Sequence, residues 1–305
     1  MHIQDILSTS RGTSTFSFEF FPPRTPVAVK TLQSTLDQLA PLRPAFASVT
    51  YGAGGSTREL TQSLVAELTQ SDVFDPIPHL TCVGHSESEI MTLLTRYAAA
   101  GVSNILALRG DLPAGHTDSG FFTHAAELVR FIKQFNERGL HPDPRGFGIG
   151  VACFPEGHPA TPNRMTEMDH LKAKVDAGAD WLCTQAFFDN ATFHDFRDRC
   201  ALAGITAPIL AGILPLTTAT GMKRMAELAC GMRYPARLIR ALNRAGDDPD
   251  DFRRIALHHA TEQCADLLDH GVPSIHLYTL NQAQPVLGIF SRLGLWRSPP
   301  TLSDS

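Results

Sequence analysis

The stretch Phe16-Ser17-Phe18-Glu19-Phe20-Phe21-Pro22-Pro23 has the composition of an aromatic β-strand that ends in two prolines and contains a single carboxylate. Burying an ionised carboxylate in such surroundings costs free energy. Glu19 is therefore expected either to be neutral at working pH or to be held by specific partners. Both situations suggest a general acid.

Seven further apolar runs of strand length follow, and longer amphipathic segments separate them, which is typical of βα units and a parallel sheet. The eight predicted strands, with ends good to about three residues, are 16–21, 46–51, 77–83, 104–109, 147–154, 181–187, 208–214 and 274–280. Eight strands favour closure into a single (β/α)8 TIM barrel. An open doubly wound sheet is the alternative, but the glycines of 146–150 lack the spacing of its phosphate-binding turn and lead into a strand.

The segments between the strands are predicted to be helices. Residues 86–100 begin with a Ser-x-x-Glu capping box formed by Ser86 and Glu89. The stretch of about 217–271, between the seventh and eighth strands, is long enough for more than one helix, with breaks at Pro235 and Pro249. We expect extra helices there, one of which could cover the barrel mouth.

Composition limits the possible partners. A net charge of −5 over 305 residues gives no basic footprint for nucleic acid and argues against an anionic membrane surface. The six cysteines form no CxxC pair and no Cys/His spacing suited to zinc, so no metal site is expected. The first residues lack the pattern of a signal peptide, and no apolar run is long enough to span a bilayer. These features predict an unprocessed, soluble cytoplasmic protein with one domain.

Polar or ionisable side chains stand at the ends of most predicted strands, where the active sites of TIM barrels lie. Each of them also has a simpler explanation. His79 could be a satisfied core residue, Arg109 and Asp111 could form an ion pair that closes a loop, and Lys174 could lie on a solvated helix face. Glu156 and His158 could form a proton relay or, more simply, a polar wall.

Taken in order, these segments resemble the 5,10-methylenetetrahydrofolate reductase family in its short bacterial form. The resemblance runs from Phe16 to about Gly294. It rests on the segments 18–23, 50–53, 79–82, 108–113, 155–159, 174–179, 212–215 and 278–281. It implies an N-terminal extension over residues 1–15 and an FAD-binding (β/α)8 catalytic barrel over residues 16–305.

The resemblance implies reduction of 5,10-methylenetetrahydrofolate to 5-methyltetrahydrofolate, with FAD as cofactor and NADH or NADPH as hydride donor in a ping-pong cycle that supplies methionine synthesis. Glu19 matches the acid that protonates the folate's leaving nitrogen, and Asp111 matches a carboxylate beside flavin and pterin. The matched FAD contacts are Thr50, Tyr51, His79, Leu108, Arg109, Gly110, Asp111, Phe154, His158, Glu167 and Lys174. The matched substrate contacts are Glu19, Gln185, Met225, Tyr278 and Gln282. The family also implies a homo-oligomer, either a dimer or a tetramer.

Five positions differ from the usual family pattern. Phe154 replaces a tyrosine, Glu167 an aspartate, Ala186 a phenylalanine, Met225 a phenylalanine that stacks on the nicotinamide, and Gln282 an arginine. Because of Met225, an alternative is the same folate reduction with a protein electron donor of ferredoxin or flavodoxin type. A third hypothesis is a folate- or flavin-binding barrel without catalysis, against which Glu19 and Asp111 argue.

Overall fold

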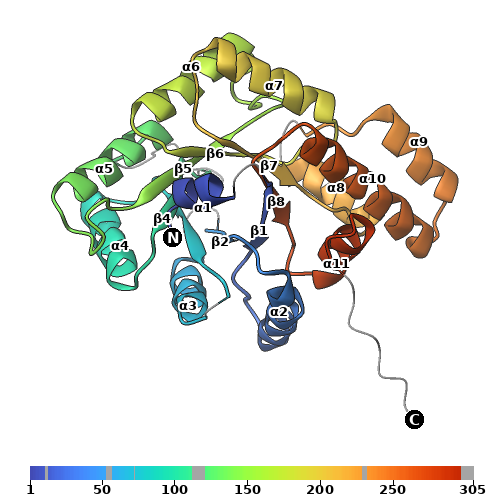
Figure 1. The fold of residues 1–305 in the computed structure, drawn as a ribbon, viewed down its shortest axis with the longest axis horizontal. Helices are drawn as coiled ribbons and strands as arrows, with labels where there is room; N and C mark the ends of the chain where they lie inside the picture. The colour runs from blue at the N-terminus through green and yellow to red at the C-terminus, as the bar shows by residue number, and fades with distance from the viewer. Residues whose placement is uncertain (11–12, 53–56, 72, 112–120, 229–231, 297–305) are drawn as a thin grey trace.

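The computed structural model describes residues 1–10, 13–52, 57–71, 73–111, 121–228 and 232–296, and its strands form a closed parallel barrel (Figure 1). Each strand pairs with the next, and β8 pairs with β1. The strands are β1 (Thr15–Phe20), β2 (Ala47–Val49), β3 (Pro76–Thr81), β4 (Asn104–Leu108), β5 (Gly148–Cys153), β6 (Trp181–Thr184), β7 (Ile209–Ile213) and β8 (Ser274–Tyr278). The predicted (β/α)8 barrel is confirmed, and the predicted strand ends are correct to within about three residues.

Helices surround the barrel, and one short helix near the N-terminus lies across its end (Figure 1). They are α1 (Ile3–Thr9), α2 (Pro26–Leu39), the short 3-10 helix η1 (Ala40–Leu42), α3 (Arg58–Thr69), α4 (Glu87–Ala99), α5 (Ala125–Glu137), α6 (Arg164–Asp176), α7 (Asn190–Leu202), α8 (Ala219–Leu228), α9 (Ala236–Ala245), α10 (Pro249–Asp269) and α11 (Ala283–Arg292). The predicted capping box starts α4. The Ser86 hydroxyl accepts the backbone N–H of Glu89 at 3.3 Å, and the Glu89 carboxylate accepts the backbone N–H of Ser86 at 2.8 Å.

Three helices, α8 to α10, lie between β7 and β8, as the length of that segment predicts. Pro235 precedes α9, and Asp248 caps α10 by accepting the backbone N–H of Asp250 at 2.8 Å. These helices share an apolar cluster with the segments that follow β6 and β7, and its buried residues include Phe188, Leu214 and Leu238. The extra helices therefore adjoin one side of the barrel's C-terminal rim.

The two faces of each strand have different environments, because successive side chains point to opposite sides. Phe18 and Phe20 point outward into the main core, where their ring centroids lie 6.0 Å from those of Phe290 and Phe74 respectively. Ser17 and Glu19 point toward the barrel axis, where they meet residues of β2, β3 and β8.

The lower part of the barrel interior is apolar. This barrel floor consists of Ile3, Phe46, Ile77, Leu106, Trp181, Cys183 and Leu210, with α1 packed beneath it. The backbone N–H of Ile3 donates to Asn104 Oδ1 at 3.1 Å, which fixes α1 to β4. Gly150 makes room for the large indole, because a Cβ at that position would lie 2.2 Å from the Trp181 ring. The interior is therefore closed at this end.

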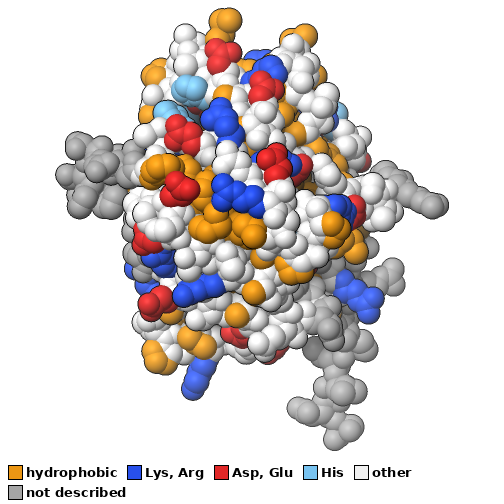
Figure 2. Space-filling model, turned by 90° about the vertical axis from the view of Figure 1, so that its left-hand side faces the viewer, with side chains coloured by type: hydrophobic (Ala, Val, Ile, Leu, Met, Phe, Trp, Pro, Cys, Tyr) orange, Lys and Arg blue, Asp and Glu red, His pale blue; other side chains and the backbone are white. Residues whose placement is uncertain are grey.

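The surface in Figure 2 carries basic and acidic side chains that are interspersed, with hydrophobic side chains gathered near the middle of the face. This view shows no basic stripe of the kind that nucleic-acid-binding proteins present. Among the described helices, none is both long enough and apolar enough to cross a membrane.

Candidate active site

Glu19 lies at the C-terminal end of β1, and three groups approach the same oxygen of its carboxylate. Oε2 is 3.5 Å from the Ser48 hydroxyl, 3.4 Å from His79 Nε2 and 3.8 Å from His276 Nε2. The expectation that specific partners hold this carboxylate is confirmed. The aromatic setting expected from the sequence is wrong, because the neighbouring phenylalanines lie on the opposite face of the strand.

His276 on β8 connects this carboxylate to the barrel interior. Its Nδ1 lies 2.8 Å from the Ser17 hydroxyl, and its Nε2 lies 3.1 Å from the Ser48 hydroxyl. The ring is stacked on Phe46, with centroids 5.5 Å apart and planes inclined by 15°. Sequence reasoning did not identify Ser17, Ser48 or His276 as site residues. The available signal was the alternation of polar residues at 17 and 19 on β1 and at 276 and 278 on β8.

His79 on β3 is buried beside Glu19, and it is not the satisfied core histidine that the simpler explanation proposed. Its Nε2 is shielded from solvent and has no hydrogen-bond partner among the described contacts. Burial, assisted by the nearby His276, lowers the pKa of His79, and Glu19 opposes that shift. A neutral imidazole therefore lies against the carboxylate, with its Nε2 3.4 Å from Glu19 Oε2.

Two predicted substrate residues lie at the ends of β6 and β8. The Tyr278 hydroxyl donates to the Thr184 carbonyl at 2.6 Å, and burial raises the pKa of Tyr278 well above its ordinary value. Gly212 on β7 allows this crossing, because a Cβ there would lie 2.7 Å from Tyr278 Oη. Gln185 follows Thr184 directly, and its Oε1 accepts the backbone N–H of Ala186 at 2.9 Å.

The end of β5 brings together several predicted FAD contacts. Lys174 Nζ donates to the Ala152 carbonyl at 2.6 Å and lies 5.9 Å from the centroid of the Phe154 ring. Burial lowers the pKa of Lys174, while negative charge from Glu167 opposes that shift. The ring of His158 meets Phe154 edge-on, with centroids 4.8 Å apart. Lys174 is therefore not on a solvated helix face, unlike Lys172, which pairs with Asp176 at 2.8 Å.

Glu156 belongs to a different contact from its neighbour His158. Its Oε2 accepts the backbone N–H of Arg233 at 2.8 Å, and burial raises the pKa of Glu156. The contact connects the β5 end to the segment before α9. This contact agrees with the simpler explanation, in which Glu156 is part of a polar wall.

Tyr51 follows β2, next to Thr50, in a second polar cluster. Its hydroxyl lies 3.0 Å from His85 Nε2, and His85 Nδ1 lies 2.7 Å from an Arg58 guanidinium nitrogen. Arg58 also donates to Glu89 at 3.1 Å. The Thr50 carbonyl accepts the Thr61 hydroxyl at 3.0 Å, so both predicted residues are anchored to α3 and α4.

The end of β4 carries Leu108, Arg109, Gly110 and Asp111. Arg109 and Asp111 are exposed, and the described contacts include no ion pair between them. Gly110 has φ +83° and a Cβ there would lie 2.8 Å from Thr81 Cβ, so the backbone passes close to β3. The loop-closing ion pair is therefore not formed in the described structure, and both charges face the rim.

The chain is similar to known proteins over almost its whole length. The sequence model of the family "Methylenetetrahydrofolate reductase" matches residues 2–294. The chain belongs to this family. It is 36% identical over 289 residues to 5,10-methylenetetrahydrofolate reductase of Escherichia coli (strain K12), covering 95% of this chain and 94% of that one.

The plant relatives are longer. The chain is 39% identical over 300 residues to methylenetetrahydrofolate reductase (NADH) 1 of Arabidopsis thaliana, which covers 94% of this chain but only 49% of the plant protein. It thus spans about half the length of this plant relative. Among solved structures, a Clostridium thermocellum protein described as binding two copies of 5-methyl-5,6,7,8-tetrahydrofolic acid superposes with a TM-score of 0.62 at 13% identity, covering 94% and 95% of the two chains. At that identity the likeness supports the fold.

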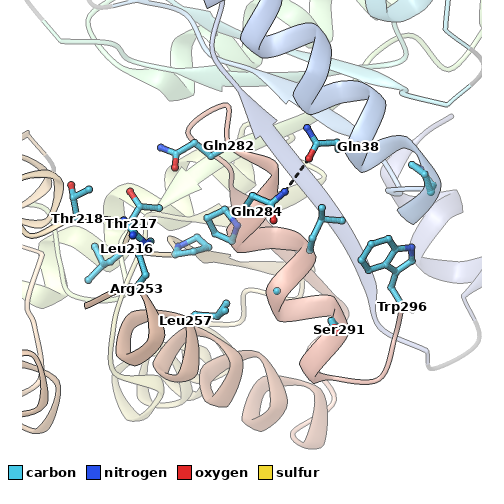
Figure 3. Close-up of a pocket in the computed structure, with 15 residues that line it drawn as sticks. Gln38, Leu216, Thr217, Thr218, Arg253, Leu257, Gln282, Gln284, Ser291 and Trp296 are labelled. Carbon is cyan, nitrogen blue, oxygen red and sulfur yellow. Dashed lines mark hydrogen bonds between the residues drawn. The ribbon is translucent and has the colours of Figure 1, made fainter. Parts of the chain in front are cut away.

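Two predicted substrate residues of this family member have no described contact with Glu19. Met225 on α8 is half-buried against the apolar cluster that also contacts Tyr278. Gln282 directly precedes α11 and lines a cavity of about 930 Å³ between α2, α10, α11 and the segment after β7 (Figure 3). Glu19 does not line this cavity. Glu19 and its partners gather instead at the barrel mouth.

The described residues include one cluster with the donor set of a metal site, formed by His194 on α7, Asp266 on α10 and His270 directly after α10. Its donors already bond to one another. His194 Nε2 lies 3.1 Å from the Asp266 carboxylate, and His270 Nδ1 lies 2.7 Å from the Asp266 carbonyl. The cluster belongs to the helix layer and has no contact with Glu19 among the described residues.

Proposed function

We propose that this protein reduces 5,10-methylenetetrahydrofolate to 5-methyltetrahydrofolate, with FAD as cofactor and a reduced nicotinamide as donor in a ping-pong cycle. Family membership supports the reaction, and one structural observation carries the chemistry. The Glu19 carboxyl is 18% exposed at the barrel mouth, while the interior contacts only its Oε2. One oxygen is thus anchored and the group is still within reach of a ligand.

The role of Glu19 follows from the substrate. The five-membered ring of the folate opens to an iminium only when the leaving nitrogen is protonated, and a positioned carboxylic acid supplies that proton. The cationic iminium is stabilised by nearby negative charge. Asp111, which is exposed on the same rim at the end of β4, provides such a charge.

The residues present suit FAD. Arg109 is exposed at the end of β4 and forms no ion pair among the described contacts, so its charge is accessible to an anionic ligand. Arg109 and Lys174 provide the positive charge that a diphosphate requires. The residues that would hold FAD are those matched by the family: Thr50, Tyr51, His79, Leu108, Arg109, Gly110, Asp111, Phe154, His158, Glu167 and Lys174. When bound, FAD would accept a hydride from the donor and pass it to the folate.

The remaining residues would orient the folate and the nicotinamide. Gln185 carries both a donor and an acceptor for a heterocycle edge, and Tyr278 contributes a ring at the same side of the mouth. Met225 and Gln282 would contact the nicotinamide and the outer part of the folate. We place the enzyme in the cytoplasm as a dimer or tetramer that supplies methyl groups for methionine synthesis.

The test is anaerobic spectroscopy of the purified protein. NADH and then NADPH are added while the flavin band near roughly 450 nm is followed, since its loss reports hydride transfer to the cofactor. Rapid bleaching that methylenetetrahydrofolate reverses supports the proposal and identifies the donor. A bound flavin that neither nucleotide reduces favours the second candidate, a protein electron donor, which the Met225 substitution suggests. Failure to bind flavin even after reconstitution contradicts the proposal.

A further inference from the structure

We propose that His276, acting through Ser48, is a positioning residue for the acid Glu19, because it makes Oε2 the oxygen that accepts hydrogen bonds and so leaves the transferable proton on Oε1. The inference rests on the proposed function, in which Glu19 protonates the folate. It concerns three residues that lie on three different strands and that no sequence motif connects.

The direction in which hydrogen bonds are donated along this chain of residues decides which oxygen of Glu19 carries the proton. The Ser48 hydroxyl has one proton, and it lies 3.5 Å from Glu19 Oε2 and 3.1 Å from His276 Nε2. If Nε2 carries the imidazole proton, His276 donates to Ser48 and Ser48 donates to Oε2. The Ser17 hydroxyl then donates to Nδ1 at 2.8 Å. Every donor in the chain has an acceptor.

The opposite polarity is less favourable. With the imidazole proton on Nδ1, Ser48 would donate to His276, and only a proton on Oε2 of Glu19 could complete the chain. The Ser17 hydroxyl hydrogen would then have no acceptor among the described contacts, and Ser17 is fully buried. Leaving a buried donor unsatisfied costs about 1–3 kcal/mol. The acid's proton would also point into the barrel and away from the substrate.

The surroundings hold the imidazole in place and select the same oxygen. Phe46 stacks on the His276 ring, Tyr278 meets it edge-on with centroids 5.5 Å apart, and the ring is 1% exposed. His79 Nε2 lies 3.4 Å from Oε2, and in the described structure no hydrogen bond or ion pair reaches Oε1. Two further titratable groups face the carboxylate: burial, assisted by the negative charge of Glu19, raises the pKa of Cys183 on β6 and of Tyr278 on β8.

The first experiment compares Ser48→Ala with Ser274→Ala in single-turnover oxidation of the reduced enzyme by methylenetetrahydrofolate. Ser274 is a matched control, because it is a buried barrel serine on β8 whose hydroxyl has no described partner. Losing the hydrogen bond that orients the acid should slow the folate step of Ser48→Ala by about tenfold, the equivalent of one hydrogen bond. Flavin reduction by the nicotinamide should be unchanged in both variants. Equal folate rates in the two variants would overturn the inference.

A double-mutant cycle separates positioning from a structural effect. If Ser48 acts only through Glu19, Ser48→Ala should cause no further loss in a Glu19→Gln background. An additive tenfold loss would overturn the inference. Folate reduction that survives Glu19→Gln alone would instead contradict the proposed function, so the two failures can be told apart.

Two measurements address His276 directly. His276→Gln keeps one donor and one acceptor, whereas His276→Leu keeps neither, so the folate rate should be largely retained by the first and lost by the second. Equal losses would contradict the role of the chain. In ¹⁵N NMR of histidine-labelled protein, His276 should be the Nε2–H tautomer. The Nδ1–H tautomer would reverse the chain and overturn the inference, whatever the activity.

Discussion

The two ends of the barrel interior are built from the same strands but from different chemistry. At the floor, Trp181 and Phe46 pack with aliphatic side chains and α1 closes the barrel. At the mouth, Glu19, His79 and His276 face one another and the carboxylate is partly exposed. We therefore expect stability to depend on the floor and the proposed chemistry to depend on the mouth. Substitutions at the two ends should have effects that can be measured separately.

The largest effect is expected at the mouth, from Glu19→Gln. Removing a general acid lowers the rate of the step it serves by about 10²–10⁴-fold. The amide is close in shape to the carboxyl, so the free energy of unfolding should change little. Rapid-reaction measurement of folate reduction, together with urea unfolding, checks both statements. A variant that keeps the folate rate would remove Glu19 from the mechanism.

The corresponding change at the floor is Trp181→Ala. Deleting a buried aromatic side chain costs about 3–5 kcal/mol of stability, and the Trp181 ring is almost fully buried beside Gly150. The folate rate per folded, flavin-loaded molecule should stay near that of the wild type. Trp296→Ala is the matched control, since it removes the other tryptophan, which is only partly buried. A loss of rate without a loss of stability would contradict the division between floor and mouth.

An intermediate effect is expected where the two regions meet, from Gly212→Ala. The new Cβ would lie 2.4 Å from the Thr184 carbonyl oxygen and 2.7 Å from Tyr278 Oη. Overpacking of this kind costs about 1–3 kcal/mol, and here it also displaces a mouth residue. Both the free energy of unfolding and the KM for the folate should change. A change in stability alone would show that Tyr278 has no part in binding.

The fold was predictable because its signal is local. Apolar runs such as 104–108 and 209–213 are short, regularly spaced and separated by amphipathic segments, and this pattern suffices for a parallel barrel. The same locality explains the error about Glu19. Its neighbours in sequence are phenylalanines, but the period of two in a strand places them on the other face.

The site was predictable only in part, because barrel closure joins residues that are distant in the chain. Ser17 and His276 are 259 positions apart and meet because β8 pairs with β1. Alternation shows that both face one side of their strands, but it does not show which strands adjoin. Lys174 illustrates the opposite case. Its helical neighbours indicate a solvated face, and only the packed structure shows its ammonium at the Ala152 carbonyl.

The smallest effect concerns the second polar cluster of the mouth and depends on pH. Arg58 can only donate, so His85 Nδ1 must accept and the imidazole proton must lie on Nε2, facing Tyr51. If Nδ1 were protonated, its N–H would face an N–H of the Arg58 guanidinium, and two positively charged donors would repel each other. Burial and the charge of Arg58 accordingly lower the pKa of His85 below its ordinary value of 6.5.

This shift makes the stability of the mouth sensitive to acid. Below pH 6.5 the unfolded chain binds a proton at His85 before the folded chain does, so the free energy of unfolding falls until the lowered pKa is reached. The slope from one group is at most about 1.4 kcal/mol per pH unit.

His85→Gln removes this titration. Urea unfolding is measured at pH 7.5 and 5.5, two values on the order of one unit to either side of the ordinary pKa. Between them, the free energy of unfolding should fall less in this variant than in the wild type. Other buried histidines with lowered pKa, such as His2 and His259, are present in both proteins, so the difference reports His85 alone. Equal losses would mean that His85 is protonated as readily in the folded protein as in the unfolded chain, and Arg58 would then have to move away from it.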